Sequence, residues 1–180
     1  MRVKYLNFIE QWKEESTDLL PLINKVLSSG KYIGINTEDI NKFENKVSKI
    51  CNTKKCITLN SGTDALTLAL YANGISKDDE VITVSNSYIA TVGSIIHLKA
   101  KPIFVDVNDD LNIDPKIIES SITKKTKAIM PVHLTGRMCD MESINQIAKK
   151  YNLKVIEDAA QSFGAKFNNK ICGSHNNITC

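Results

Sequence analysis

Val155-Ile-Glu-Asp-Ala-Ala-Gln-Ser-Phe-Gly-Ala165 begins with two β-branched apolar residues and passes directly into two acids. This pattern predicts a short buried strand that carries Glu157 and Asp158 at its carboxyl end, the edge where ligands bind in open α/β sheets. Asp158 and Gln161 are separated by two alanines, so both side chains can face one ligand from a helix-like turn. A carboxylate beside an amide suits a flat heteroaromatic ring with a basic nitrogen and a phenolic oxygen. The alternative is an acid that caps the following turn.

Upstream of this segment, short apolar runs alternate with helical patterns. Strands are expected at 56–59, 81–84, 103–105, 128–132 and 154–156, and helices at 63–71, 89–98, 115–121 and 141–151. This alternation predicts an α/β fold with a mostly parallel sheet and helices on both faces. Residues 1–50 are expected to form an N-terminal helical segment, in which Ser28-Ser-Gly30 ends one helix and Thr37 or Asp39 starts the next. Residues 51–180 form the α/β part.

Composition excludes several classes of protein. The chain has 180 residues, 42% hydrophobic and 24% charged, with a net charge of +3 spread over mixed acids and bases. These values fit an ordinary globular core. The sequence also contains no basic stripe of the kind that binds nucleic acid. An apolar run long enough for a membrane span is absent, as is an apolar signal core. The five cysteines fit no zinc spacing, so we expect no metal site and a cytoplasmic location with reduced thiols.

A second candidate binding segment is Asn60-Ser-Gly-Thr-Asp-Ala-Leu66, which follows an expected strand and opens an expected helix. Gly62 allows a close approach of the backbone, and the free N–H groups of a helix start favour phosphate. Ser61 and Thr63 add hydroxyl donors. The alternative is a routine helix cap.

Two further segments follow strands. In Ser85-Asn-Ser-Tyr-Ile-Ala-Thr91, the ring of Tyr88 can stack on a planar ligand, while small Ala90 and Thr91 leave room; the alternative is an interface tyrosine. In Pro131-Val-His-Leu-Thr-Gly136, His133 can support the strand-end acid from behind. The alternative is a histidine that is hydrogen-bonded within the core.

Together and in this order, these segments resemble the DegT/DnrJ/EryC1/StrS family of sugar aminotransferases. The resemblance extends over nearly the whole chain and rests on Ser29-Gly-Lys-Tyr-Ile-Gly34, Asn60 to Leu66, Asn86 to Thr91, Pro131 to Gly136, Val155 to Ala165 and Gly173-Ser174. It implies a pyridoxal 5'-phosphate (PLP) enzyme, with residues 51–180 as part of the large domain of the aspartate aminotransferase fold (fold type I).

The resemblance also implies roles for individual residues. Gly62 and Thr63 would bind the cofactor phosphate, and Tyr88 would stack on the pyridine ring. Asp158 would pair with the ring nitrogen as the catalytic acid, because a nearby carboxylate keeps that nitrogen protonated. Gln161 would contact the phenolic oxygen.

The implied reaction moves an amino group from glutamate or glutamine to a nucleotide-linked ketosugar in a homodimeric enzyme. The family's Schiff-base lysine lies beyond the position of Cys180, so we expect a chain truncated at its C-terminus, without the C-terminal domain and inactive alone. One alternative is a PLP-dependent sugar dehydratase of the same fold, in which histidine replaces that lysine. Another is a non-catalytic truncated binding protein.

Overall fold

The computed structural model describes residues 4–32, 37–175 and 177–180. Contacts divide the chain into two compact units, Met1–Phe43 and Glu44–Cys180, and each is described by itself. Residues 33 and 34 of the Ser29–Gly34 motif lie outside the described residues. The expected division after residue 50 stays a prediction.

Two helices form the N-terminal segment, as the sequence predicts. Helix α1 (Phe8–Ser29) ends at Gly30, whose φ of 64° is the left-handed conformation that glycine adopts without strain. Helix α2 (Glu38–Ile50) continues into the second unit, and the Thr37 hydroxyl accepts a hydrogen bond from the N–H of Ile40 at its start. Helix α1 has no buried residue and leaves several large apolar side chains exposed, namely Leu19, Leu20, Leu22, Ile23 and Leu27.

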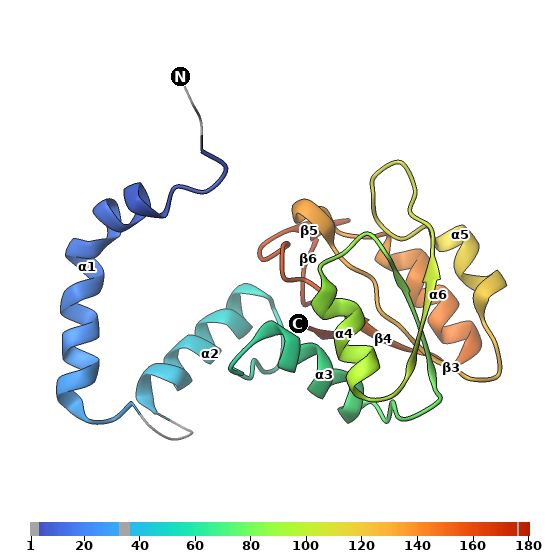
Figure 1. The fold of residues 1–180 in the computed structure, drawn as a ribbon, viewed down its shortest axis with the longest axis horizontal. Coiled ribbons are helices and arrows are strands. Elements are labelled where there is room, and N and C mark those ends of the chain that lie inside the picture. The colour runs from blue at the N-terminus through green and yellow to red at the C-terminus, as the bar shows by residue number, and fades with distance from the viewer. Residues whose placement is uncertain (1–3, 33–36, 176) are drawn as a thin grey trace. The chain divides into compact units, whose positions relative to one another are not determined.

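The second unit is built on a five-stranded sheet of order β2-β1-β3-β4-β7, and all its ladders are parallel (Figure 1). The strands are β1 (Glu80–Val84), β2 (Lys101–Val105), β3 (Thr126–Ile129), β4 (Lys154–Glu157) and β7 (Ile178–Thr179). The prediction of an α/β fold with a mostly parallel sheet is therefore confirmed.

Helices pack on both faces of this sheet and enclose two separate cores. One core joins α3 (Gly62–Ala72) and α4 (Ile89–His97) to the sheet through residues such as Leu70, Ile95 and Ile156. The other joins α5 (Pro115–Ile118) and α6 (Met141–Tyr151) to the sheet through residues such as Ile144 and Val155. Val155 and Ile156 lie in different cores because successive side chains of a strand point to opposite faces.

The strand order reverses direction at β1, and this reversal places the candidate site. From β1 the chain crosses to β2 on one side, and from β2 it crosses back past β1 to β3. The helices that follow β1 and β3 consequently pack on opposite faces, α4 in one core and α6 in the other. In open α/β sheets, such a reversal opens a crevice at the carboxyl ends of the two strands. The loops after β1, β3 and β4 all start at this edge.

The expected strand at Cys56–Leu59 is wrong. Those residues have no ladder partner among the described residues, and Ile57 is 74% exposed. Instead, one carboxylate oxygen of Glu44 accepts hydrogen bonds from the backbone N–H and the hydroxyl of Thr58, both at 2.8 Å. An extended segment becomes a strand only where a neighbouring strand supplies its backbone partners.

Smaller elements complete the unit. The 3-10 helices η1 (Glu119–Ser121) and η2 (Leu134–Gly136) follow α5 and β3. The hairpin of β5 (Lys166–Phe167) and β6 (Lys170–Ile171) turns at Asn168 and Asn169, both with positive φ. Lys166 and Lys170 lie on this exposed hairpin. Within the described parts of the chain, none of the helices combines the length and apolar character that crossing a membrane requires.

Candidate active site

Asp158 follows β4 directly and is held by its backbone. Its N–H donates to the carbonyl of Pro131 at 2.9 Å, and its carbonyl accepts from the N–H of His133 at 3.0 Å. These bonds extend the pairing of β3 and β4 beyond the strands themselves, through the bridge between Val132 and Asp158. The residue is only 6% exposed, so its carboxylate has a defined place at the sheet edge.

The carboxylate of Asp158 has two donors from this chain and retains room for another. The hydroxyl of Thr91 donates to Oδ2 at 2.6 Å, and the N–H of Ala160 donates to Oδ1 at 3.3 Å. A carboxylate accepts about four hydrogen bonds, so acceptor positions remain for a protonated ring nitrogen. The oxygen of Ser87 lies 2.6 Å from that of Thr91 and extends the network. Sequence reasoning misses the Thr91 hydroxyl as a partner of Asp158, because the two residues are 67 apart in the chain.

Tyr88 is the N-cap residue of α4, one turn before Thr91. Its carbonyl accepts from the N–H of Thr91 at 3.1 Å, while its side chain is 74% exposed. The backbone of this tyrosine is therefore fixed within the turn that supports Asp158, and its ring remains available for stacking.

Gln161 is oriented by the loop after β3. Its Oε1 accepts from the N–H of Thr135 at 2.7 Å. Since the carbonyl end of the amide is occupied, the NH₂ end is left to donate to a ligand oxygen. Thr135 has a φ of 54° and Gly136 a φ of 84°, so this loop makes a tight turn against Gln161. Sequence reasoning also misses Thr135, whose contribution comes from its backbone.

Gly62 and Thr63 form the first turn of α3, where backbone N–H groups have no intrahelical acceptor. A Cβ atom on Gly62 would meet no atom within 4 Å, so the space above this turn is open. The Ser61 hydroxyl accepts from the N–H of Asp64 at 3.1 Å and so acts as the helix cap. Because α3 and α4 pack in the same core, the phosphate-binding candidates lie on the face of the sheet that also holds Asp158.

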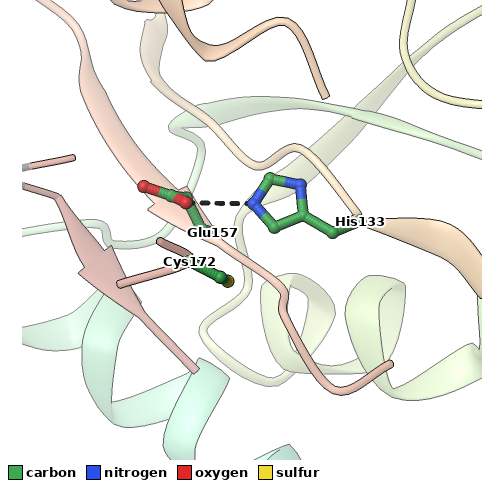
Figure 2. A group of neighbouring side chains, drawn as sticks. All are labelled: His133, Glu157 and Cys172. Carbon is green, nitrogen blue, oxygen red and sulfur yellow. Dashed lines mark hydrogen bonds and ion pairs between the residues drawn. The ribbon is translucent and has the colours of Figure 1, made fainter. Parts of the chain in front are cut away.

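His133 and Glu157 form a fully buried pair. Nε2 of His133 lies 2.9 Å from Oε2 of Glu157 (Figure 2). Nδ1 of His133 accepts from the N–H of Cys139, so the ring proton is on Nε2 and is donated to the carboxylate. The amide of Asn177 donates to the other oxygen of Glu157 at 2.8 Å. The structure thus places His133 against Glu157 within the core, as in the core-histidine alternative of the sequence analysis.

Cys172 is the third member of this group. Its sulfur and the nearest donor atoms of His133 and Glu157 lie within 4.8 Å of one another, and Figure 2 shows the three side chains converging. Burial is the main cause that raises the pKa of the Cys172 thiol, which keeps it protonated. Both oxygens of Glu157 already accept hydrogen bonds from His133 and Asn177, and the hydrogen-bond partner of the Cys172 sulfur is the hydroxyl of Ser162 at 3.4 Å.

Comparison with known proteins identifies the family. Residues 13–180 match the model of the DegT/DnrJ/EryC1/StrS aminotransferase family. A dTDP-3-amino-3,6-dideoxy-alpha-D-galactopyranose transaminase of Aneurinibacillus thermoaerophilus is 54% identical over 155 residues, which cover 84% of this chain and 42% of the relative. A protein of Geobacillus stearothermophilus named pleiotropic regulatory protein is 42% identical over 174 residues, covering 96% of this chain and 46% of the relative.

Solved structures support the same family assignment. The crystal structure of DesV from S. venezuelae in complex with a ketimine intermediate superimposes with a TM-score of 0.94 at 34% identity, covering 99% of this chain and 48% of that chain. The structure of ntda from Bacillus subtilis with bound cofactor PMP gives a TM-score of 0.85 at 36% identity, covering 96% and 40%. The chain thus spans less than half the length of these relatives. Over the part that it spans, both the sequence and the fold show that this chain belongs to the DegT/DnrJ/EryC1/StrS aminotransferase family.

Proposed function

We propose that this chain is the N-terminal, cofactor-binding part of a PLP-dependent enzyme that transfers an amino group from glutamate or glutamine to a nucleotide-linked ketosugar. The observation that carries the proposal is the carboxylate of Asp158. It lies at the carboxyl end of β4, accepts from Thr91 at 2.6 Å and retains acceptor positions. Gln161 presents a free NH₂ group from the same loop.

The chemistry of these donors fits PLP. Asp158 accepts from a protonated pyridine nitrogen, Gln161 donates to the phenolic oxygen, and Tyr88 offers an exposed ring for stacking. Gly62 and Thr63 bind the phosphate through the free N–H groups of α3. When bound, PLP supplies an electron sink. The role of this chain is to orient the ring and to hold the proton on its nitrogen.

His133 has a supporting role in this proposal. The backbone N–H of His133 donates a hydrogen bond to the backbone carbonyl of Asp158, and its imidazole Nε2–H donates to the carboxylate of Glu157. It therefore holds the end of β4 in place from behind the catalytic acid without contact with the cofactor. No metal takes part in the proposed chemistry.

We further propose that the full-length enzyme is a cytoplasmic homodimer. The exposed apolar residues of α1, such as Leu20, Leu22 and Leu27, supply surface that a second subunit can bury. Sedimentation of the full-length enzyme should give a dimer, and an active monomer would contradict this proposal.

The reaction is tested with the full-length protein. It is loaded with pyridoxamine phosphate (PMP) and mixed with nucleotide-linked 3- and 4-ketosugars in single-turnover experiments followed by absorbance. Conversion of the bound cofactor with formation of an aminosugar supports the proposal. Loss of water from the sugar without amino transfer would indicate the dehydratase alternative, and failure to bind PMP would indicate a non-catalytic binding protein.

The position of the covalent lysine is tested by reducing the PLP-loaded full-length protein with borohydride and mapping the modified peptide. We expect a single modified lysine outside residues 1–180. Stoichiometric modification of Lys166 or Lys170, both on the exposed β5–β6 hairpin, would show that the chemistry has been assigned to the wrong place.

A further inference from the structure

Three oxygen atoms form a short chain behind the candidate site. The hydroxyl oxygens of Ser87 and Thr91 are 2.6 Å apart, and the Thr91 oxygen is 2.6 Å from Oδ2 of Asp158. Thr91 is fully buried and Asp158 is 6% exposed. Buried hydroxyls need hydrogen-bond partners, and the partners present here determine which oxygen donates and which accepts in each bond.

The proton positions follow from simple counting. A threonine hydroxyl has one proton, and the carboxylate of Asp158 can only accept. The Thr91 proton therefore points to Asp158, and Ser87 must donate its own proton to the Thr91 oxygen. Each hydroxyl is held as a donor in the direction of the acid, so the Thr91 proton fixes the orientation of Oδ2 of Asp158.

We infer that Thr91 is a positioning residue: locked as a donor by Ser87, it holds the carboxylate of Asp158 aimed at a protonated heterocyclic nitrogen. The inference rests on the proposed function and assigns a part of the site to α4. Thr91 touches neither the cofactor nor the substrate in this scheme, and it acts through Asp158.

The position of Thr91 in α4 gives this contact a second consequence. Tyr88 caps α4, and its carbonyl accepts from the N–H of Thr91 at 3.1 Å. One turn of backbone thus carries both the aromatic ring proposed to stack on the cofactor and the hydroxyl that orients the acid. The turn that would supply the stacking ring of Tyr88 therefore also orients the acid that would face the nitrogen of a bound ring.

The experiment uses the full-length protein and PMP that is ¹⁵N-labelled at the ring nitrogen. Thr91→Val removes the hydroxyl while keeping the shape of the side chain, and Thr91→Ser restores the hydroxyl. Thr83→Val is the matched control, because Thr83 is also fully buried and donates to the carbonyl of Met130 at 2.8 Å. Binding of PMP, binding of inorganic phosphate and the ¹⁵N shift of bound PMP are measured for each variant.

We expect Thr91→Val, like Asp158→Asn, to retain most of its affinity for PMP, because the phosphate and stacking contacts are unchanged. Its ¹⁵N shift should move toward that of the unprotonated ring. Thr91→Ser and Thr83→Val should resemble the wild type, and phosphate binding should be the same in all variants. Ser87→Ala, a milder change at a half-buried position, should shift the ¹⁵N signal in the same direction by a smaller amount.

A wild-type ¹⁵N shift in both Thr91→Val and Ser87→Ala would overturn the inference. An equal movement of the ¹⁵N shift in Thr83→Val would also overturn it, because the effect would then be general to buried threonines. If Thr91→Val does not fold, Ser87→Ala and Thr91→Ser decide the question. Failure of the wild-type protein to bind PMP would instead overturn the proposed function, and the role of Thr91 would be withdrawn with it.

Discussion

Glu157 and Asp158 are consecutive in the chain, but their carboxylates are bound on opposite faces of the sheet. Glu157 accepts from His133 and Asn177, and Asp158 accepts from Thr91 of α4. The alternation of side chains along a strand causes this separation. One acid has both oxygens occupied within the core, whereas the other keeps acceptor positions at the sheet edge. Under the proposed function, Glu157 therefore has a structural task and Asp158 a chemical one.

The chemical task is tested by Asp158→Asn in the full-length enzyme. The amide keeps the size of the side chain but removes the charge that stabilises a protonated ring nitrogen. A charge-assisted hydrogen bond is worth about 1.5–3 kcal/mol, so the single-turnover rate with a ketosugar nucleotide should fall by at least about tenfold to a hundredfold. Cofactor binding should largely persist, because the phosphate and stacking contacts are unchanged. A wild-type rate with cofactor bound would remove Asp158 from the mechanism.

Gln161→Ala should have a smaller effect on the same rate. Its hydrogen bond to the phenolic oxygen tunes the ring but carries no charge, so a loss of about 0.5–1.5 kcal/mol is expected. Single-turnover absorbance measurements on both variants give the comparison. A larger loss in Gln161→Ala than in Asp158→Asn would reverse the assignment of the two roles.

The structural task of Glu157 is tested by His133→Ala. This change leaves the fully buried Glu157 with Asn177 as its remaining side-chain donor. Leaving a buried carboxylate without one of its hydrogen-bond donors costs about 1–3 kcal/mol, so the melting temperature should fall by several degrees. His97→Ala is the matched control, because His97 is exposed on α4. Equal melting temperatures for His133→Ala and the control would show that the pair contributes nothing to stability.

His175 makes the fold sensitive to acid. Burial is the main cause that lowers the pKa of this imidazole below its ordinary value of 6.5, and Glu157 acts in the opposite direction. The unfolded chain therefore binds a proton at pH values where the folded chain does not, so stability falls as the pH drops below about 6.5. We expect the fall in melting temperature between pH 7.5 and 5.5 to be smaller in His175→Asn. An unchanged pH dependence, matching that of His97→Asn, would contradict this.

Cysteine reactivity should follow burial. Burial raises the pKa of the Cys139 thiol to about 12, and the same cause raises that of Cys180 to about 12. Since the thiolate is the reactive form, both should resist iodoacetamide at pH 8 in the folded protein. Cys56 is half-buried, whereas Cys139 is buried, so Cys56 should be alkylated before Cys139, as peptide mass spectrometry over time can establish. Early labelling of Cys139 would indicate that its surroundings open readily.

The sequence predicts most strands of the sheet because the residue types that favour each strand lie within the strand itself. β-Branched runs mark β1 and β4, and the left-handed glycine at position 30 ends α1 as expected. The segment 56–59 has the same local signal, but forming a strand depends on a neighbour that its own residues do not encode. The hydrogen-bond partners of Asp158 and Glu157 could not be predicted from the sequence for a similar reason. A threonine 67 residues away and an asparagine 20 residues away become relevant only after the strands are ordered.

The strand order also has a consequence for the time course of folding. β1 lies between β2 and β3 in the sheet. We therefore expect β2, which is nearest to β1 in the chain, to pair with it before β3 and β4 are added. Contacts between distant residues require closure of long loops, which slows their formation. We therefore expect the link between Thr91 and Asp158, separated by 67 residues, to form late, after β3 and β4 have joined the sheet. On this expectation, a newly synthesised chain would acquire its oriented acid only once the surrounding sheet is in place.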